Sequence, residues 1–323
     1  MNSRKKILFI CGSLNQTTQM HKIASYLAAD FDCYFTAFYC NPVWYPFQKM
    51  GLLDWTIIGG QNRDKTERYF KEQGLKVDYR GQSDDYDLVL TCTDLLVQNN
   101  IKNKPVILVQ EGMTDPENLA FLVVKYFRKL GVPRWIASTS TTGLSDAYVK
   151  FCVASEGYRR HFVNKGVREE KVVVTGIPNF DNVKEFEKND FPYRDHVLVA
   201  TTDTRENFKW DNRKAFLRKV RDIASGRQVV FRLHPNENHR RSTREILQII
   251  PTAVVYTTGN TSEMIANCHT LVTQYSSVAY IGLALGKQVH SYFDVKELKE
   301  LCPIQNGGTS AQTISEVCRE VLQ

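Results

Sequence analysis

The stretch HVLVATTDTREN, residues 196–207, begins as a short apolar run and continues directly into hydroxyl-bearing and charged side chains. An apolar run of this length, followed by turn residues, is typical of a buried strand in a parallel sheet. The same pattern returns in QVVFRLHPNE at 228–237 and in HTLVTQYSSV at 269–278. A basic segment with a helical pattern, 212–224, separates the first two runs. Strands that alternate with helices predict βαβ units and a parallel sheet in this half of the chain.

The first half of the chain repeats this alternation. Its expected strands are residues 5–13, 32–40, 86–93, 105–110, 148–154 and 171–174, and its expected helices are 21–29, 63–73 and 118–129. The second half adds expected strands at 253–256 and 288–292 and expected helices at 262–267, 276–285 and 313–322. The fold class that follows is α/β, with two Rossmann-like, doubly wound domains facing a central cleft.

One polar segment between the two halves is the best candidate for a linker. Residues 178–194 (PNFDNVKEFEKNDFPYR) contain two prolines and lack a strand pattern. We therefore expect an amino-terminal domain at 1–180, a linker at 181–194 and a carboxy-terminal domain at 195–323. Ligands of such sheets bind outside the carboxyl ends of the strands, which is where the polar motifs fall.

The composition excludes several classes of protein. Hydrophobic residues make up 42% and charged residues 24% of the 323 residues, which is the balance of a globular chain with about two domains. No apolar run reaches the ~18 residues of a membrane-spanning helix, and the apolar core Ile7–Cys11 is too short for a signal peptide. Eight cysteines without C-x-x-C or zinc spacing indicate reduced thiols in a cytoplasmic protein.

The positive charge of the chain is concentrated in one segment. The formal net charge is +7, and residues 205–244 contain 12 basic and four acidic side chains. Such a segment suits phosphate-bearing ligands or an anionic membrane surface, although a solvated helix face has the same composition. The basic residues lack the interleaving with aromatic residues that nucleic-acid-binding proteins show, so nucleic acid is not an expected partner.

Two motifs of the first half follow expected strands. Gly12-Ser13 comes after the first strand, where a tight turn and a helix N-terminus can hold an anion, although a plain βα turn has the same residues. Gln110-Glu111-Gly112 ends another strand, and a carboxylate there is placed to take a proton from an acceptor hydroxyl. A capping or surface carboxylate is the alternative interpretation of Glu111. Three further carboxylates are weaker candidates for the base: Asp94, Asp115 and Asp146.

Two motifs of the second half place hydroxyl groups at strand ends. Thr202 and Arg205 follow the strand 196–201 and are candidates to contact a phosphate, with a capped βα turn as the alternative. Tyr275, Ser276 and Ser277 lie between a strand and an expected helix. Two hydroxyls beside the N–H groups of a helix N-terminus predict a phosphate cradle, with a simple N-cap as the alternative.

A third motif of the second half contains the histidine of greatest interest. Arg232, His234 and Pro235 stand at the end of the strand QVVFRL, and the proline stops that strand. A lone histidine is more often structural than functional. An imidazole at a strand end among basic residues is nevertheless suited to stabilising a leaving phosphate, and Arg232 is a candidate to assist it.

In order and spacing, these motifs resemble those of GT-B-fold nucleotide-sugar enzymes over nearly the whole chain. VLVATTDTRENF at 197–208 resembles the HRREN-containing strand and loop of UDP-N-acetylglucosamine 2-epimerases, and residues 154–181 are similar to the segment closing their first domain. Residues 271–289 align with the epimerase segment that carries Asp-Ser-Gly-Gly and paired glutamates. Tyr280 and Ile281 stand where those glutamates would lie, and Asp203 or a neighbouring threonine replaces the HRREN histidine.

The His-Pro and Tyr-Ser-Ser motifs are more similar to two other GT-B groups. One is the CDP-glycerol glycerophosphotransferases, and the other is the bacterial sialyl-, polysialyl- and Kdo-type transferases that use CMP-sugars. The resemblance implies that Glu111 is the catalytic base, that His234 contacts the nucleotide, and that Ser276 and Ser277 hold phosphate. Gln110 departs from the acidic-acidic-Gly motif of the second group.

The resemblance implies an inverting GT-B glycosyltransferase or a related phosphopolyol transferase. The expected donor is a nucleotide-activated sugar, with cytidine favoured over uridine, and the expected acceptor is a hydroxyl of a surface glycan or lipid-linked saccharide, as in capsule, lipopolysaccharide or teichoic-acid-like polymers. No cofactor and no metal are expected, because no Asp-x-Asp stands at a strand end. The alternatives are a nucleotide-sugar epimerase or hydrolase and a non-catalytic GT-B nucleotide-binding subunit.

The expected location is the cytoplasm. Peripheral contact with the inner face of the membrane and assembly into a homo-oligomer both stay open, because neither requires a spanning segment.

Overall fold

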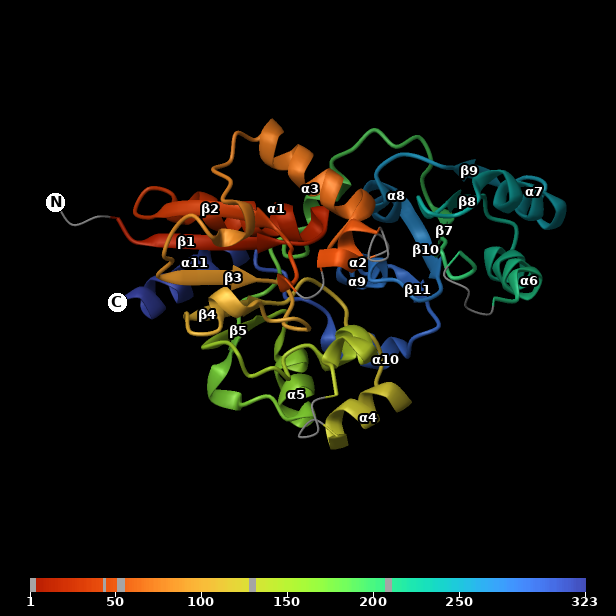
Figure 1. Cartoon of the computed structure of the whole chain (residues 1–323). Helices are drawn as coiled ribbons and strands as arrows, with labels where there is room; N and C mark the ends of the chain where they lie inside the picture. Colours follow the sequence, from red (N-terminus) through yellow and green to blue (C-terminus); the bar gives the residue numbers. More distant parts are fainter. Residues whose placement is uncertain (1–3, 43–44, 51–55, 128–131, 207–210) are drawn as a thin grey trace. The chain divides into compact units, whose positions relative to one another are not determined.

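The chain consists of two compact units, each built on its own sheet (Figure 1). The structure is a computed structural model that describes residues 4–42, 45–50, 56–127, 132–206 and 211–323. The first unit comprises Met1–Asp181 together with Asn306–Gln323, and the second comprises Asn182–Gln305.

The first unit contains a six-stranded sheet in the order β2-β1-β3-β4-β5-β6. All neighbouring strands of this sheet are parallel. The strands are β1 (Lys6–Cys11), β2 (Asp32–Ala37), β3 (Leu88–Thr91), β4 (Val106–Val109), β5 (Lys150–Val153) and β6 (Val172–Val174). β1, β3 and β4 are buried almost throughout, which explains their unbroken apolar sequences.

Helices and short 3₁₀ turns complete the first unit. The helices are α1 (Leu14–Leu27), α2 (Tyr45–Lys49), α3 (Gly60–Glu72), α4 (Leu119–Phe127), α5 (Glu156–Lys165) and α11 (Ser310–Leu322). The 3₁₀ turns are η2 (Tyr79–Gly81), η3 (Asn99–Ile101), η5 (Arg134–Thr141) and η6 (Glu169–Lys171).

The end of the chain requires a correction to the expected domains. We expected residues 195–323 to form the second domain, but Asn306–Gln323 belong to the first unit. α11 packs beside α1 (Figure 1), and Ile314 and Cys318 join the core around β1. Ser310 N–H donates to Asp181 Oδ2 at 2.9 Å, which anchors the start of the helix. An amphipathic helix does not reveal which of two sheets it covers, so the sequence could not predict this return.

The second unit contains a five-stranded parallel sheet in the order β11-β10-β7-β8-β9. Its strands are β7 (His196–Ala200), β8 (Val229–Arg232), β9 (Val254–Tyr256), β10 (Cys268–Thr273) and β11 (Gln288–His290). Its helices are α6 (Arg213–Ala224), α7 (His239–Ile249), α8 (Thr261–Asn267), α9 (Val278–Ala284) and α10 (Val295–Leu301), and η7 (Val183–Glu187) is a 3₁₀ turn.

The expected linker at 181–194 packs as part of a unit. From Asn182 onward the segment belongs to the second unit. The ring of Phe191 lies 5.6 Å from that of His196 and 5.5 Å from that of Tyr256, measured between centroids. Asn267 Nδ2 donates to Asn189 Oδ1 at 2.6 Å. The segment is polar in sequence, but Phe191 and Tyr193 within it pack against His196 and Tyr256 and so attach it to the sheet.

Both strand orders contain a point where the chain direction across the sheet reverses. In the first unit this point lies between β1 and β3, and in the second it lies between β7 and β10. The carboxyl ends of such strand pairs are where α/β sheets bind ligands.

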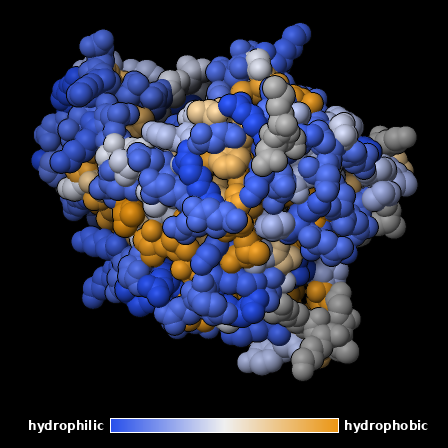
Figure 2. All heavy atoms as spheres, turned by 90° about the vertical axis from the view of Figure 1, so that its left-hand side faces the viewer, coloured by the Kyte–Doolittle hydropathy of each residue, from blue (hydrophilic) through white to orange (hydrophobic). Residues whose placement is uncertain are grey.

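Hydrophilic residues predominate on the face of the molecule in Figure 2. None of the helices in the described part of the chain combines the length and the apolar composition needed to cross a membrane.

Candidate functional site

Glu111 of the first unit stands just beyond the carboxyl end of β4, as expected from the sequence. Three side chains at the start of α1 hold its carboxylate. Ser13 Oγ and Asn15 Nδ2 donate to Oε1 at 2.9 and 3.2 Å, and Gln16 Nε2 donates to Oε2 at 2.5 Å. The carboxylate thus has a defined orientation beside the N-terminus of a helix, where negative charge is favourable.

Gly12 and Ser13 position the side chains that hold Glu111. Gly12 N–H donates to Gln16 Oε1 at 2.9 Å, and a Cβ on Gly12 would lie only 2.3 Å from that oxygen. Ser13 is the N-cap of α1, because its hydroxyl accepts the N–H of Gln16 while it also donates to Glu111. In this structure the two residues therefore orient the Glu111 carboxylate.

Gln110 both donates and accepts a hydrogen bond, and a carboxylate at this position could only accept. Its Nε2 donates to the Gly112 carbonyl at 2.8 Å, and its Oε1 accepts the N–H of Ala154 at 2.9 Å. The side chain is buried and fixes the turn that presents Glu111. A glutamine can fill both roles at once because an amide carries a donor and an acceptor.

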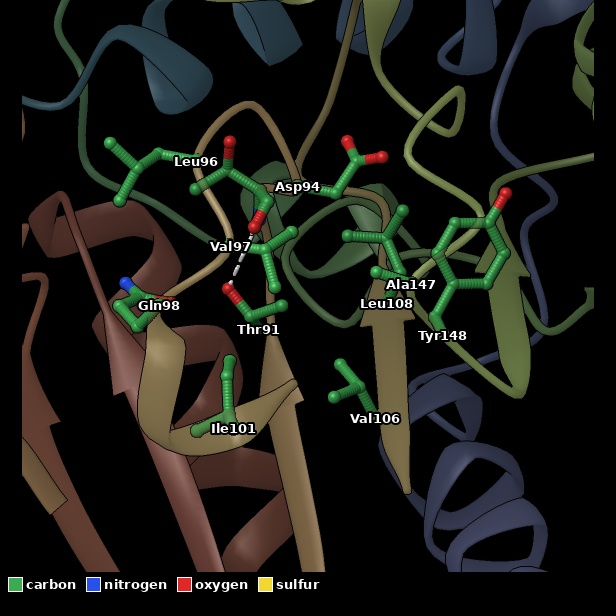
Figure 3. A pocket seen from close by; sticks show the side chains of 11 residues that line it. Thr91, Asp94, Leu96, Val97, Gln98, Ile101, Val106, Leu108, Ala147 and Tyr148 are labelled. Atoms are coloured by element: carbon green, nitrogen blue, oxygen red, sulfur yellow. Dashed lines mark hydrogen bonds between the residues drawn. The ribbon is translucent and has the colours of Figure 1, made fainter. Parts of the chain in front are cut away.

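Asp94 has a structural role in the first unit. Its two carboxylate oxygens accept the N–H groups of Gly143 and Ser145, each at 3.0 Å. Asp94 also borders a cavity of about 10 Å³, enough for one water molecule, and its carboxylate points away from Ile101 and Val106 (Figure 3). This volume is too small for a substrate.

The two other weaker candidates are occupied elsewhere. Asp115 Oδ2 accepts the hydroxyl of Thr139 at 2.7 Å, and Asp146 pairs with Arg168 and Lys171. Burial tends to raise the pKa of Asp146, but the hydrogen bonds from these two cations outweigh it and the pKa is lowered.

At the reversal point of the second unit, two loops meet through buried polar side chains. Thr202 Oγ1 lies 2.7 Å from Thr204 Oγ1 and donates to Gln274 Oε1 at 3.1 Å. Gln274 Nε2 in turn donates to Asp211 Oδ1 at 2.9 Å. Thr202 and Gln274 therefore tie the loop after β7 to the loop after β10, and the Thr202 hydroxyl is buried rather than presented to solvent.

His234 follows β8 on a turn that Glu237 stabilises through a hydrogen bond to the backbone. The His234 N–H donates to Thr201 Oγ1 and to Glu237 Oε2, each at 3.0 Å. Its ring Nδ1 accepts the N–H of Asn236 at 3.2 Å and lies 3.6 Å from Asp203 Oδ2. In a neutral ring the proton then sits on Nε2. The side chain is 37% exposed, so Nε2 is suited to donate to a ligand.

A buried network of charges supports this turn, and the sequence did not predict it. Arg213 Nη2 lies 2.5 Å from Glu237 Oε1, and Arg213 Nε lies 3.3 Å from Asp211 Oδ2. Thr201 and Ser242 also donate to Glu237. Glu237 stands three residues after His234 and its burial could not be predicted from sequence, since acidic residues are rarely buried.

The two predicted arginines are already engaged by the protein. Arg205 forms a bidentate ion pair with Glu245: Nη1 donates to Oε1 at 3.0 Å and Nη2 donates to Oε2 at 2.9 Å. Burial tends to lower the pKa of Arg205, but the hydrogen bond to Glu245 and the attraction of nearby carboxylates together outweigh it, and the pKa is raised. Arg232 donates to the carbonyls of Leu233, Thr257 and Gly259, and burial lowers its pKa. Both guanidinium groups therefore have partners within the second unit.

The motif after β10 is accessible. Tyr275 is exposed, with its ring edge against Tyr292 and Phe293. Ser276 Oγ accepts the N–H of Val278 at 3.4 Å, and Ser277 occupies the N-cap position of α9 without a side-chain cap. Both hydroxyls are half-buried. Pro235 is exposed in the turn after His234.

Sequence and structure thus agree on where the polar motifs lie. Among the residues that the structure describes, no three His, Cys, Asp or Glu side chains gather as a metal site requires. Three residues were not predicted: Asn15 and Gln16, which hold Glu111 in the first unit, and Gln274, which ties two loops of the second unit. Each follows the carboxyl end of a strand, β1 or β10, and this position was the signal that could have found them.

No protein-family model matches this sequence, and no curated protein matches it. Solved structures do. The UDP-GlcNAc 2-epimerase of Neisseria meningitidis bound to UDP-GlcNAc has a TM-score of 0.63 at 14% identity, covering 98% of this chain and 100% of its own. The S. aureus MnaA–UDP co-structure has a TM-score of 0.61 at 13% identity, covering 98% and 97%. The wall teichoic acid polymerase TagF has a TM-score of 0.51 at 14% identity, covering 99% and 89%. The chain has the GT-B fold of these nucleotide-sugar enzymes.

Proposed function

We propose that this chain is a GT-B transferase that moves a sugar, or a related phosphopolyol, from a cytidine-activated donor to a hydroxyl of a surface glycan. The observation that carries the proposal is the Glu111 carboxylate, which Ser13, Asn15 and Gln16 orient at the carboxyl end of β4. Orienting a carboxylate with three donors is what a general base at a fixed position requires.

Glu111 has capacity left to accept a proton. Among the described residues, Oε1 accepts two hydrogen bonds and Oε2 accepts one, from Gln16. A carboxylate oxygen has two lone pairs, so one lone pair of Oε2 is available to an acceptor hydroxyl. As the acceptor oxygen bonds to the anomeric carbon, its proton passes to Glu111. The bond from that carbon to the donor phosphate breaks, and the electron pair leaves with the nucleotide, so the configuration inverts.

The second unit is the proposed donor site. His234 Nε2 is placed to donate to the leaving phosphate, and the accessible hydroxyls of Ser276 and Ser277 offer further donors. The exposed Tyr275 ring is suited to pack against the nucleoside. A cytidine nucleotide is favoured because the His-Pro and Ser-Ser motifs resemble those of CMP-sugar and CDP-glycerol enzymes. A variant of TagF has been soaked with CDPG, and this supports the proposal of a cytidine donor.

One observation favours transfer over epimerisation. Tyr280 and Ile281, which stand where the epimerase glutamates would lie, are buried within α9. No carboxylate is available at these two positions to hold a ribose, so the second unit lacks that feature of a UDP-sugar epimerase. The fold similarity to the epimerases makes epimerisation the second candidate function.

The deciding experiment compares nucleotide binding with product formation. Thermal-shift titrations with CMP, CDP, UMP, UDP and GDP should raise the Tm for CMP or CDP, and His234→Ala should abolish the rise. His269→Ala is the matched control, since His269 is exposed at the amino end of β10. A response to UDP alone, together with a changed sugar when the donor is incubated without acceptor, would instead establish the epimerase. Nucleotide binding that survives without any turnover would indicate a non-catalytic subunit.

A further inference from the structure

One helix of the first unit presents an apolar stripe to solvent. Leu119, Leu122, Val123, Tyr126 and Phe127 of α4 are all exposed, Leu119 by 80% and Tyr126 by 77%. Their spacing is i, i+3, i+4, i+7 and i+8, which places them on a single face of an α-helix. In a surface helix of a globular protein this stripe faces the core.

The core contact of α4 is made by its opposite face. Phe121 and Val124 are completely or almost completely buried. Lys125 Nζ and Lys165 Nζ lie 5.6 and 5.7 Å from the Phe121 ring centroid. The helix is therefore apolar on both faces. Packing within its own unit explains the apolar residues of the buried face but not those of the exposed face.

The exposed stripe continues onto a neighbouring element. η5 packs against α4, and its Trp135 and Ile136 are about half-exposed. Of the 17 large apolar side chains that are exposed in the described part of the chain, seven lie within residues 119–136. Single exposed apolar residues are ordinary, but this concentration marks an interaction surface. We call these seven residues the α4–η5 surface.

The segment that carries this surface has a positive net charge. From Asp115 to Ser145 the sequence contains four basic residues, Lys125 and Arg134 among them, and two acidic ones. Of these two, Glu117 precedes the helix, and Asp115 accepts the hydroxyl of Thr139 in η5. Apolar and aromatic residues that are flanked by basic ones match a bilayer interface with anionic head groups. Trp and Tyr are the aromatic residues enriched at that interface.

We propose that the α4–η5 surface docks the first unit onto an anionic lipid bilayer. Leu119, Leu122 and Tyr126 enter the interfacial region, and Lys125 contacts the phosphate groups of the lipids. A second copy of the chain is a poorer occupant. A two-fold interface would bring two segments of the same positive net charge together, and like charges repel. The proposal does not depend on the transferase activity proposed above.

The test is co-sedimentation of the whole protein with lipid vesicles. We expect binding to phosphatidylcholine vesicles that contain about 30% phosphatidylglycerol, weaker binding to pure phosphatidylcholine, and loss of the difference at high salt. Leu119→Ser/Tyr126→Ser should lower the partition coefficient at least about fivefold. Both side chains are too exposed for the double variant to unfold the unit.

The matched control removes the same two residue types elsewhere. Tyr26→Ser/Leu247→Ser replaces an exposed tyrosine on α1 and an exposed leucine on α7, and it should bind vesicles like the unaltered protein. Equal binding by both double variants, or no sedimentation of the unaltered protein with either vesicle, would overturn the proposal. A concentration-dependent dimer that only Leu119→Ser/Tyr126→Ser dissociates, without vesicle binding, would assign the surface to a second copy. Nucleotide thermal shifts on the same variants report separately on the proposed function.

Discussion

Arg213 and Glu237 form a buried ion pair directly beneath the turn that carries His234. Arg213 Nη2 lies 2.5 Å from Glu237 Oε1, while Glu237 Oε2 accepts the His234 N–H at 3.0 Å. Both side chains of the pair are at most 5% exposed. The position of the imidazole therefore depends on a charge pair that no ligand is expected to touch.

Arg213→Met should destabilise the second unit by about 3 kcal/mol, because it leaves the buried charge of Glu237 without its cation and leaves Asp211 with only Arg205, at 3.7 Å. Urea unfolding at pH 7 measures this loss. Arg218→Met on the same helix is the control, since Arg218 is exposed and its loss should cost less than about 0.5 kcal/mol. Equal effects of the two substitutions would contradict a structural role for the pair.

Glu111→Gln should lower the transfer rate by about 10²-fold or more while leaving nucleotide binding unchanged, because an amide cannot take the acceptor proton. Steady-state rates and nucleotide thermal shifts on one preparation separate the two effects. Glu117→Gln removes an exposed carboxylate from the same loop and should retain full activity. A Glu111→Gln protein that transfers at the normal rate would exclude Glu111 as the base.

The sequence predicted the strands better than the helices. The apolar runs at 196–201 and 228–233 correspond to β7 and β8, because strands buried on both faces are apolar throughout. α7, with its many polar residues, had no expected counterpart, and neither did α5 and α10. The expected helix at 118–129 corresponds to α4, which runs from Leu119 to Phe127.

The candidate site shows a similar division. Glu111 and His234 follow strands, so their placement at the carboxyl edges was predictable from order alone. What each side chain contacts was not. Arg205 and Arg232 have the charge that suits a phosphate, yet Glu245 and backbone carbonyls engage them in the structure. Partners that lie 25 to 40 residues away in sequence become visible only when the fold is known.

Ser13→Ala should reduce activity beyond what its loss of helix capping explains. The capping loss is about 1 kcal/mol, and the Glu111 carboxylate also loses one of its three donors. Ser155→Ala is the matched control, because Ser155 caps α5 in the same way. We expect similar unfolding free energies for the two variants, but a several-fold lower kcat and a displaced pH–rate profile only for Ser13→Ala. Ser13→Thr, which keeps the hydroxyl, should restore both. An unchanged pH profile in Ser13→Ala would limit Ser13 to capping.

His196 should make the second unit less stable in mild acid. The residue is 1% exposed at the start of β7, and neither ring nitrogen has a hydrogen-bond partner among the described residues. Burial, assisted by Lys287, lowers the pKa of His196 from 6.5 to about 4. Below pH 6.5 the unfolded chain therefore binds a proton that the folded unit excludes, so stability falls as the pH drops from about 6.5 to 4. The full loss is about 3 kcal/mol.

His196→Phe, which places a ring beside that of Phe191, should remove this part of the pH dependence in urea unfolding. His269→Phe is the control and should retain the pH dependence, because His269 is exposed on the same sheet. If the unaltered protein and His196→Phe lose equal stability between pH 6.5 and 4, another group must carry the titration. His290 of the same unit, whose pKa burial also lowers, is the next to test.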